Sequence, residues 1–99
     1  MRFIDLEYGN RVLKKESEIV KTLEKLGFFW VIDSEIESAK IKIENEVIIW
    51  ESGKFYSGNW KFGIFKGGDF FGTWENGIFE GGNFNGHWIS GIRSDQKNK

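Results

Sequence analysis

Three stretches of the sequence, YSGNWKFG at 56–63, FFGTWENG at 70–77 and FNGHWISG at 84–91, decide how this chain folds. They share the pattern aromatic-x-Gly-x-Trp-x-x-Gly, and each begins 14 residues after the one before it. A fixed period of this kind means that one small unit is copied and stacked, because a single unit cannot bury its apolar face alone. We therefore expect a β-repeat array, an architecture that usually presents an extended surface to another macromolecule.

Composition divides the chain into two parts. Of 13 glycines, 11 follow Ser52, and 12 of the 17 aromatic residues lie from Trp50 onward. Residues 1–49 hold most of the Ile, Leu and Val and resemble ordinary globular sequence. The sequence thus predicts an N-terminal α+β unit over residues 1–49, an aromatic-glycine β-repeat region over 50–93 and a polar tail over 94–99.

The N-terminal part has the patterns of strands and of one helix. Residues 2–7 and 11–13 flank a turn at 8–10 that favours a hairpin. A helix is predicted for Glu16–Leu26, where apolar residues recur at helical spacing and Gly27 follows as a stop signal. The apolar run 28–32 predicts a strand buried on both faces, and the alternation over 39–44 a half-buried strand. The expected fold class is α+β.

The glycine pairs of the repeats favour an antiparallel meander. Gly67-Gly68, Asn76-Gly77 and Gly81-Gly82 suit two-residue type I′ turns, since both central positions need positive φ. Such turns place Trp74 opposite Phe79, and all the repeat aromatics then share one face of a single-layer sheet. An apolar face of that size needs a cover, so we expect a homo-oligomer formed through the aromatic face.

A β-solenoid is the competing architecture. The chain also divides into Gly-x-aromatic units, from Gly58-x-Trp60 to Gly86-x-Trp88, with spacings of 5, 5 and 4 residues. A closed 14-residue coil encloses only about 490 Å³ per rung at ~4.8 Å spacing. A benzene-sized group needs a cavity of about 150 Å³, and each coil must hold three aromatic side chains. This comparison favours the meander over the solenoid.

Each architecture has a family resemblance. The pattern at 56–63, 70–77 and 84–91 resembles the core of MORN repeats, which implies an antiparallel hairpin array with a scaffolding or membrane-proximal role. The period of 14 is shorter than the usual MORN unit. The Gly-x-aromatic units resemble pentapeptide-repeat proteins instead, best at Gly68-Asp69-Phe70 and Gly82-Asn83-Phe84, which implies a β-helix.

Charge and residue content exclude several function classes. The net charge is −1, without the basic excess of a nucleic-acid binder or the acidic excess of a DNA mimic. One histidine and no cysteine supply neither a metal site nor a nucleophile–base pair. No signal sequence or membrane-spanning run is recognisable. We therefore expect a cytoplasmic protein that is not an enzyme, has no cofactor or metal, and binds neither nucleic acid nor membrane.

The remaining hypothesis is a protein-interaction module, a small adaptor or inhibitor that binds a protein partner through its repeat sheet. A chain rich in Lys, Ile and Asn and free of Pro is common in AT-rich bacterial and phage genomes, so a phage-encoded effector is one form of this hypothesis. The alternative is a carbohydrate- or cell-wall-binding module that stacks sugars on its aromatic rows. The candidate binding residues alternate onto the face opposite the aromatics, with Phe71 as the expected anchor: Asn59, Phe71, Thr73, Glu75, Asn85, His87 and Ile89.

Overall fold

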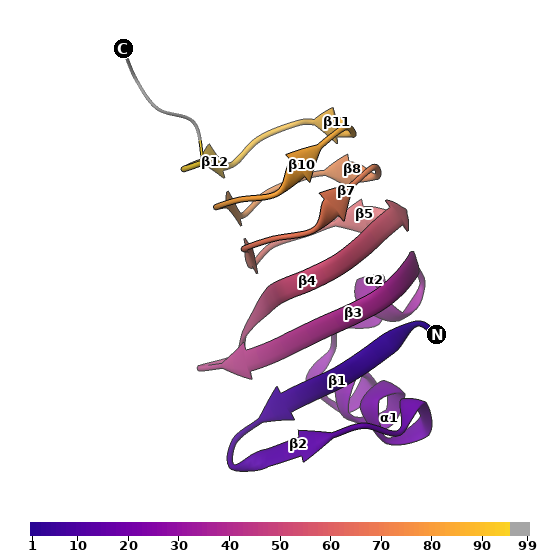
Figure 1. Ribbon diagram of the computed structural model, residues 1–99. Helices are drawn as coiled ribbons and strands as arrows, with labels where there is room; N and C mark the ends of the chain where they lie inside the picture. The colour runs from indigo at the N-terminus through magenta and orange to yellow at the C-terminus, as the bar shows by residue number, and fades with distance from the viewer. Residues whose placement is uncertain (96–99) are drawn as a thin grey trace.

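A small α/β unit followed by a stack of short parallel strands makes up residues 1–95, the part of the chain that this computed structural model describes (Figure 1). The N-terminal elements are β1 (Phe3–Tyr8), β2 (Arg11–Leu13), α1 (Glu16–Leu26), α2 (Phe29–Ile32), β3 (Glu35–Glu44) and β4 (Val47–Ser57). The stack contains β5 (Asn59–Trp60), β6 (Ile64–Phe65), β7 (Asp69–Phe70), β8 (Thr73–Trp74), β9 (Ile78–Phe79), β10 (Asn83–Phe84), β11 (His87–Trp88) and β12 (Ile92–Arg93). The fold is thus α+β, as predicted.

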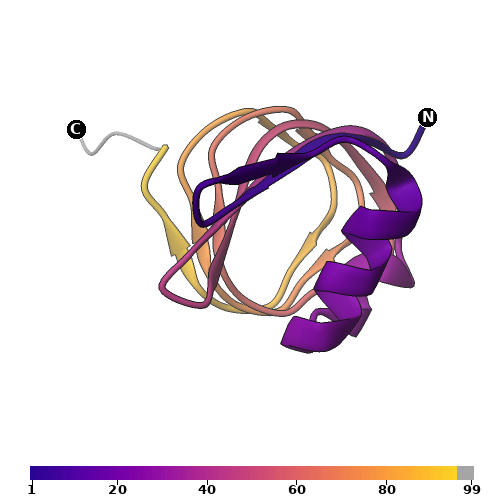
Figure 2. The same cartoon turned by 90° about the horizontal axis from the view of Figure 1, so that it is seen from below.

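The N-terminal unit is built on β1, which pairs with a strand on each side. It forms the predicted antiparallel hairpin with β2 and pairs in parallel with β3, so that α1 and α2 form the crossover. The helix α1 spans the predicted residues and buries Ile19 and Leu23. It ends at Gly27, whose φ of 87° is left-handed, and the Phe28 amide donates to the Leu23 carbonyl at 2.8 Å. Figure 2 shows both helices on one side of the coils.

The run 28–32 forms a short helix, so the prediction of a buried strand is wrong. In α2, Val31 is buried while Phe29 is exposed. A strand covered on both faces would bury both side chains. Periodicity cannot separate a strand from a helical turn in so short an apolar run. The turn brings Trp30 against Trp60, with ring centroids 5.0 Å apart and an interplanar angle of 71°. The second helix therefore closes the N-terminal end of the repeat core.

The repeats form a parallel β-solenoid. The short strands pair in parallel with the equivalent strands of the neighbouring coils: Thr73 aligns with Asn59 and His87, and Ile78 aligns with Ile64 and Ile92. The antiparallel MORN-like meander is therefore wrong, and the β-solenoid alternative is confirmed. The glycines at 68, 77 and 82 turn the chain around corners of a coil instead of reversing it into hairpins. Figure 2 looks along the stack and shows the successive coils lying over one another.

The aromatic side chains point into the coils and form three columns. Trp60, Trp74 and Trp88 stack with centroid separations of 5.1 and 5.5 Å and interplanar angles of 7° and 5°. The other columns are Trp50–Phe65–Phe79 and Phe55–Phe70–Phe84. The aromatic face is thus the interior of the molecule, and its rings are buried except at the last coil. This removes the reason for an oligomer formed through that face.

Ring orientation explains why three aromatics fit in each coil. In the second coil the planes of Phe65, Phe70 and Trp74 meet at 81–84°, so each ring places an edge against the face of its neighbours. Rings that share their contact surface in this way need less space than three separate cavities of benzene size. The expectation of a meander was wrong because it gave each ring a separate cavity of about 150 Å³.

One extra residue, Ser57, distinguishes the first coil from those above it. Phe55 aligns with Phe70, a separation of 15 residues, whereas Asn59 aligns with Thr73, a separation of 14. The repeat motif equates Tyr56 with Phe70, but Tyr56 points outward.

The predicted boundary between residues 49 and 50 lies inside the strand β4, and one buried cluster includes side chains from both predicted units. Of the predicted tail at 94–99, residues 96–99 lie outside the described residues.

Candidate protein-binding surface

Asn59, Thr73 and His87 form a ladder on the outside of the solenoid. They occupy equivalent positions in β5, β8 and β11, and their Cα atoms are in register. Backbone hydrogen bonds from Thr73 to Gly58 and from His87 to Gly72, both at 2.9 Å, fix this register. Each of these side chains points outward because the next residue in the same strand is a tryptophan that points into the coil. The ladder therefore presents an amide, a hydroxyl and an imidazole in line on a rigid support.

Beside this ladder lies an exposed aromatic pair. Phe71 stacks on Tyr56 with centroids 6.0 Å apart and an interplanar angle of 18°. The two side chains are 43% and 40% exposed. The Tyr56 hydroxyl donates to Glu37 at 2.7 Å, and this hydrogen bond raises the pKa of Tyr56. Asn85 continues the same position in the third coil, where its backbone N–H donates to the Phe70 carbonyl at 2.8 Å.

On the other side of the ladder lies a third outward column, which is charged in the first two coils and apolar in the third. Lys61 pairs with Glu75 one coil above it, at 3.1 Å. Ile89 occupies the third coil of this column and is 58% exposed. The seven residues predicted from alternation thus lie in three adjacent outward columns, none of them in the core. The outer ladder surface is defined here by those residues and two neighbours: Tyr56, Asn59, Lys61, Phe71, Thr73, Glu75, Asn85, His87 and Ile89.

A hollow lies at the N-terminal end of this surface. It is bounded by Trp30 of α2, by Asp33 directly after that helix, and by Asn59 and Lys61 from the first coil. Ser34 also lines it, held by a hydrogen bond from its hydroxyl to the Trp30 carbonyl at 2.6 Å. The hollow combines an aromatic edge, an amide and charges of both signs next to Asn59.

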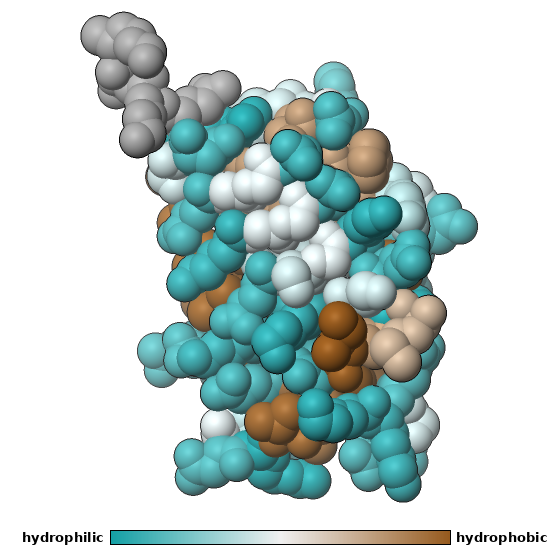
Figure 3. Space-filling view, viewed as in Figure 1, coloured by the Kyte–Doolittle hydropathy of each residue, from teal (hydrophilic) through white to brown (hydrophobic). Residues whose placement is uncertain are grey.

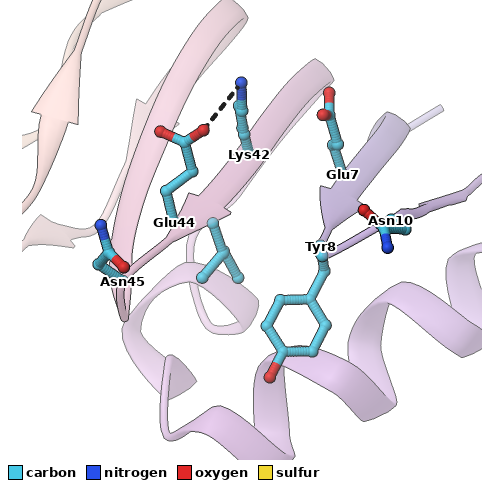
Figure 4. Close-up of a pocket in the computed structure, with 8 residues that line it drawn as sticks. Glu7, Tyr8, Asn10, Lys42, Glu44 and Asn45 are labelled. Carbon is cyan, nitrogen blue, oxygen red and sulfur yellow. Dashed lines mark ion pairs between the residues drawn. The ribbon is translucent and has the colours of Figure 1, made fainter.

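A groove lies far from these columns, at the end of the N-terminal sheet (Figure 4). Its labelled side chains come from the ends of β1 and β3 and from the turns that follow these strands, with Lys42 and Glu44 forming an ion pair at 3.1 Å. That pair raises the pKa of Lys42. Tyr8 faces the groove and is 41% exposed. The residues that line the groove include no His, Cys or Ser.

The face seen in Figure 3 is mainly hydrophilic, with separate brown areas and no continuous apolar patch. Residues 1–95 contain no group of three or more His, Cys, Asp or Glu side chains that could hold a metal ion. Neither helix in that range is long and apolar enough to cross a membrane. The outer ladder surface combines polar side chains with one exposed aromatic pair, Tyr56 and Phe71.

Comparison with known proteins gives no match: no family model, curated protein or solved structure resembles the chain significantly. The stacked coils agree with the pentapeptide-repeat resemblance at the level of a β-solenoid. In this chain, however, each coil has three inward aromatic positions at spacings of 5, 5 and 4 residues, whereas pentapeptide repeats form four-sided coils. The class that the fold defines is a three-sided aromatic β-solenoid.

Sequence reasoning missed two parts of this surface. Tyr56 was counted among the repeat aromatics because the 14-residue period hides the insertion of Ser57. Aligning Phe55, not Tyr56, with Phe70 would have turned Tyr56 outward beside Phe71. The hollow next to Asn59 depends on the helical turn at 29–32, which the pattern of the sequence does not reveal.

Proposed function

We propose that the chain is a non-enzymatic protein-binding module, a small adaptor or inhibitor that contacts its partner through the outer ladder surface. The observation that carries this proposal is the Tyr56–Phe71 pair, two stacked rings that stay exposed among polar side chains. Interface anchors are typically aromatic side chains surrounded by polar groups that exclude water.

Rigidity adds support. The backbone N–H of Phe71 donates to the Phe55 carbonyl at 2.8 Å, and its ring rests on Tyr56, whose hydroxyl is hydrogen-bonded to Glu37. A side chain fixed in this way loses little conformational entropy on binding. The neighbouring amide, hydroxyl and imidazole of the Asn59–Thr73–His87 ladder can donate or accept hydrogen bonds to a polypeptide.

The carbohydrate-binding alternative relied on exposed rows of Trp and Phe. Those rows form the buried columns of the solenoid, which leaves Tyr56 and Phe71 as the exposed stacked pair on this side. One pair supplies a much smaller platform than a row. Glycan binding is therefore an outcome of the experiments below and not the proposal.

We expect Phe71→Ala to weaken partner binding by about tenfold or more, equivalent to about 1.4 kcal/mol, because it removes the anchor. The stability change should stay within about 1 kcal/mol, since the side chain is exposed. The partner is first identified by affinity purification from the native host and mass spectrometry. Calorimetry with purified components then compares the variant with Tyr8→Ala, which removes an equally exposed aromatic from the groove of Figure 4. Wild-type affinity for Phe71→Ala, or recovery of a glycan or nucleic acid without a protein, would overturn the proposal.

His87→Ala should leave folding unchanged and reduce partner affinity by a few-fold, because a peripheral hydrogen bond contributes about 0.5–1.5 kcal/mol. Titration calorimetry of this variant beside Lys66→Ala, which removes an exposed side chain from another column, measures the effect. If the two variants bind alike, the Asn59–Thr73–His87 ladder lies outside the interface.

A further inference from the structure

Arg93 occupies an aromatic position of the repeat. It follows Gly91-x in the same way that Phe79 follows Gly77-x, and its Cα is in register with that of Phe79. Backbone hydrogen bonds from Ile92 to Gly77 at 2.9 Å and from Ser94 to Phe79 at 3.0 Å hold the flanking residues in the ladder. The column Trp50–Phe65–Phe79 therefore ends in a guanidinium group in place of a ring.

This guanidinium covers the end of the aromatic core. Its Cζ atom lies 5.0, 4.9 and 5.5 Å from the ring centroids of Phe79, Phe84 and Trp88. A cation over aromatic faces at such distances is attracted by all three rings. Asp95 accepts two hydrogen bonds from the same guanidinium, at 2.9 and 3.0 Å, and this pairing lowers the pKa of Asp95. Arg93 and Asp95 thus form a charged cap on the last coil.

The last coil has the features of a surface that could continue the stack. Among the described residues, no strand pairs with the outer edges of β10, β11 and β12. Ile89 and Ile92 on this coil are 58% and 59% exposed, and Phe84 and Trp88 are only partly buried. Unpaired strand edges beside apolar side chains are templates for association with another chain. An identical coil would match this end by symmetry.

We propose that the Arg93–Asp95 cap prevents self-association of the chain through its last coil, and that the partner it excludes is a second copy of the same coil. Two copies that met end to end would remove two Arg93–Asp95 pairs from water and would separate each Arg93 from its rings. An aromatic or apolar residue at position 93 would instead complete the column and leave a flat apolar end. Capping units with a polar outer face have this role in repeat proteins generally.

Sedimentation velocity over a micromolar concentration series tests the proposal. We expect Arg93→Phe to self-associate at least about tenfold more tightly than the wild-type chain, because the contact would remove an additional ring from water. Lys66→Phe is the matched control: it removes the same charge and adds the same ring on the side of the solenoid. It should sediment like the wild-type chain.

Arg93→Met and Arg93→Lys separate charge from shape. The methionine variant keeps a linear side chain over the rings without a charge and should also associate, so it decides the question if Arg93→Phe does not fold. The lysine variant keeps the charge and should sediment like the wild-type chain. The proposal is overturned if the folded uncharged variants sediment like the wild-type chain, or if Lys66→Phe associates as tightly as Arg93→Phe.

Discussion

Trp74→Ala is expected to destabilise the protein by about 3–5 kcal/mol, the usual cost of removing a large aromatic side chain from a core. Trp74 is fully buried between Trp60 and Trp88, at 5.1 and 5.5 Å, and meets Phe70 edge to face at 5.4 Å. Its removal opens a cavity in the middle of the Trp60–Trp74–Trp88 column and removes the ring contacts that connect the first coil with the last. Because coils are stabilised by their neighbours, this loss should spread along the stack.

Thermal unfolding followed by circular dichroism measures the effect. For a domain of about 100 residues each kcal/mol lowers the Tm by about 4–8 °C, so a loss of about 3–5 kcal/mol is expected to lower the Tm by about 12–40 °C. Phe71→Ala is the matched control, since it removes the neighbouring exposed aromatic and should change the Tm by only a few degrees. Equal decreases for the two variants would mean that Trp74 is not inside the coil.

The second large effect is expected at Gly77, a corner of the second coil. Its φ of 120° is a conformation that L residues rarely adopt. An added Cβ would lie 2.5 Å from the Gly63 carbonyl oxygen and 3.1 Å from the Trp60 Nε1 atom. That carbonyl cannot retreat without breaking its hydrogen bond from the Ile78 amide at 2.8 Å. Gly77→Ala should therefore cost about 2–6 kcal/mol, combining backbone strain with overpacking.

Gly67→Ala is the control for Gly77→Ala. Gly67 does not have a positive φ, and its added Cβ would lie 3.1 Å from a single neighbour, the Glu51 carbonyl oxygen. Its cost should be about 1 kcal/mol or less. Urea unfolding of both variants compares them directly. In an antiparallel hairpin, Gly77 would occupy a turn exposed to solvent and would not face Gly63, so equal effects at the two glycines would contradict the solenoid.

Much of the fold can be read from the sequence because the signals are local. The helix Glu16–Leu26 has regular apolar spacing and a glycine stop, and the β1–β2 hairpin has its turn residues. The direction of strand pairing could not be read in the same way. Asn76-Gly77 fits a type I′ turn and equally fits a corner with one positive φ. The choice depends on how the rings pack between coils, and sequence spacing alone does not show that.

The outward positions were predictable because a residue next to an inward aromatic must point outward in either architecture. Alternation therefore placed Thr73 and His87 correctly on the outside. It could not show that they align with Asn59 in one column, since that requires parallel pairing. The role of Arg93 was equally hidden, because an arginine at an aromatic position breaks the motif that identifies the repeat.

Nuclear Overhauser contacts between backbone protons test the parallel solenoid most directly. The parallel stack predicts contacts between residues one coil apart, from Thr73 to Asn59 and His87 and from Ile78 to Ile64 and Ile92. Aromatic contacts should likewise connect the rings of Trp60, Trp74 and Trp88. Backbone contacts across a hairpin at Asn76-Gly77, pairing Trp74 with Phe79, in the absence of contacts one coil apart would contradict the account.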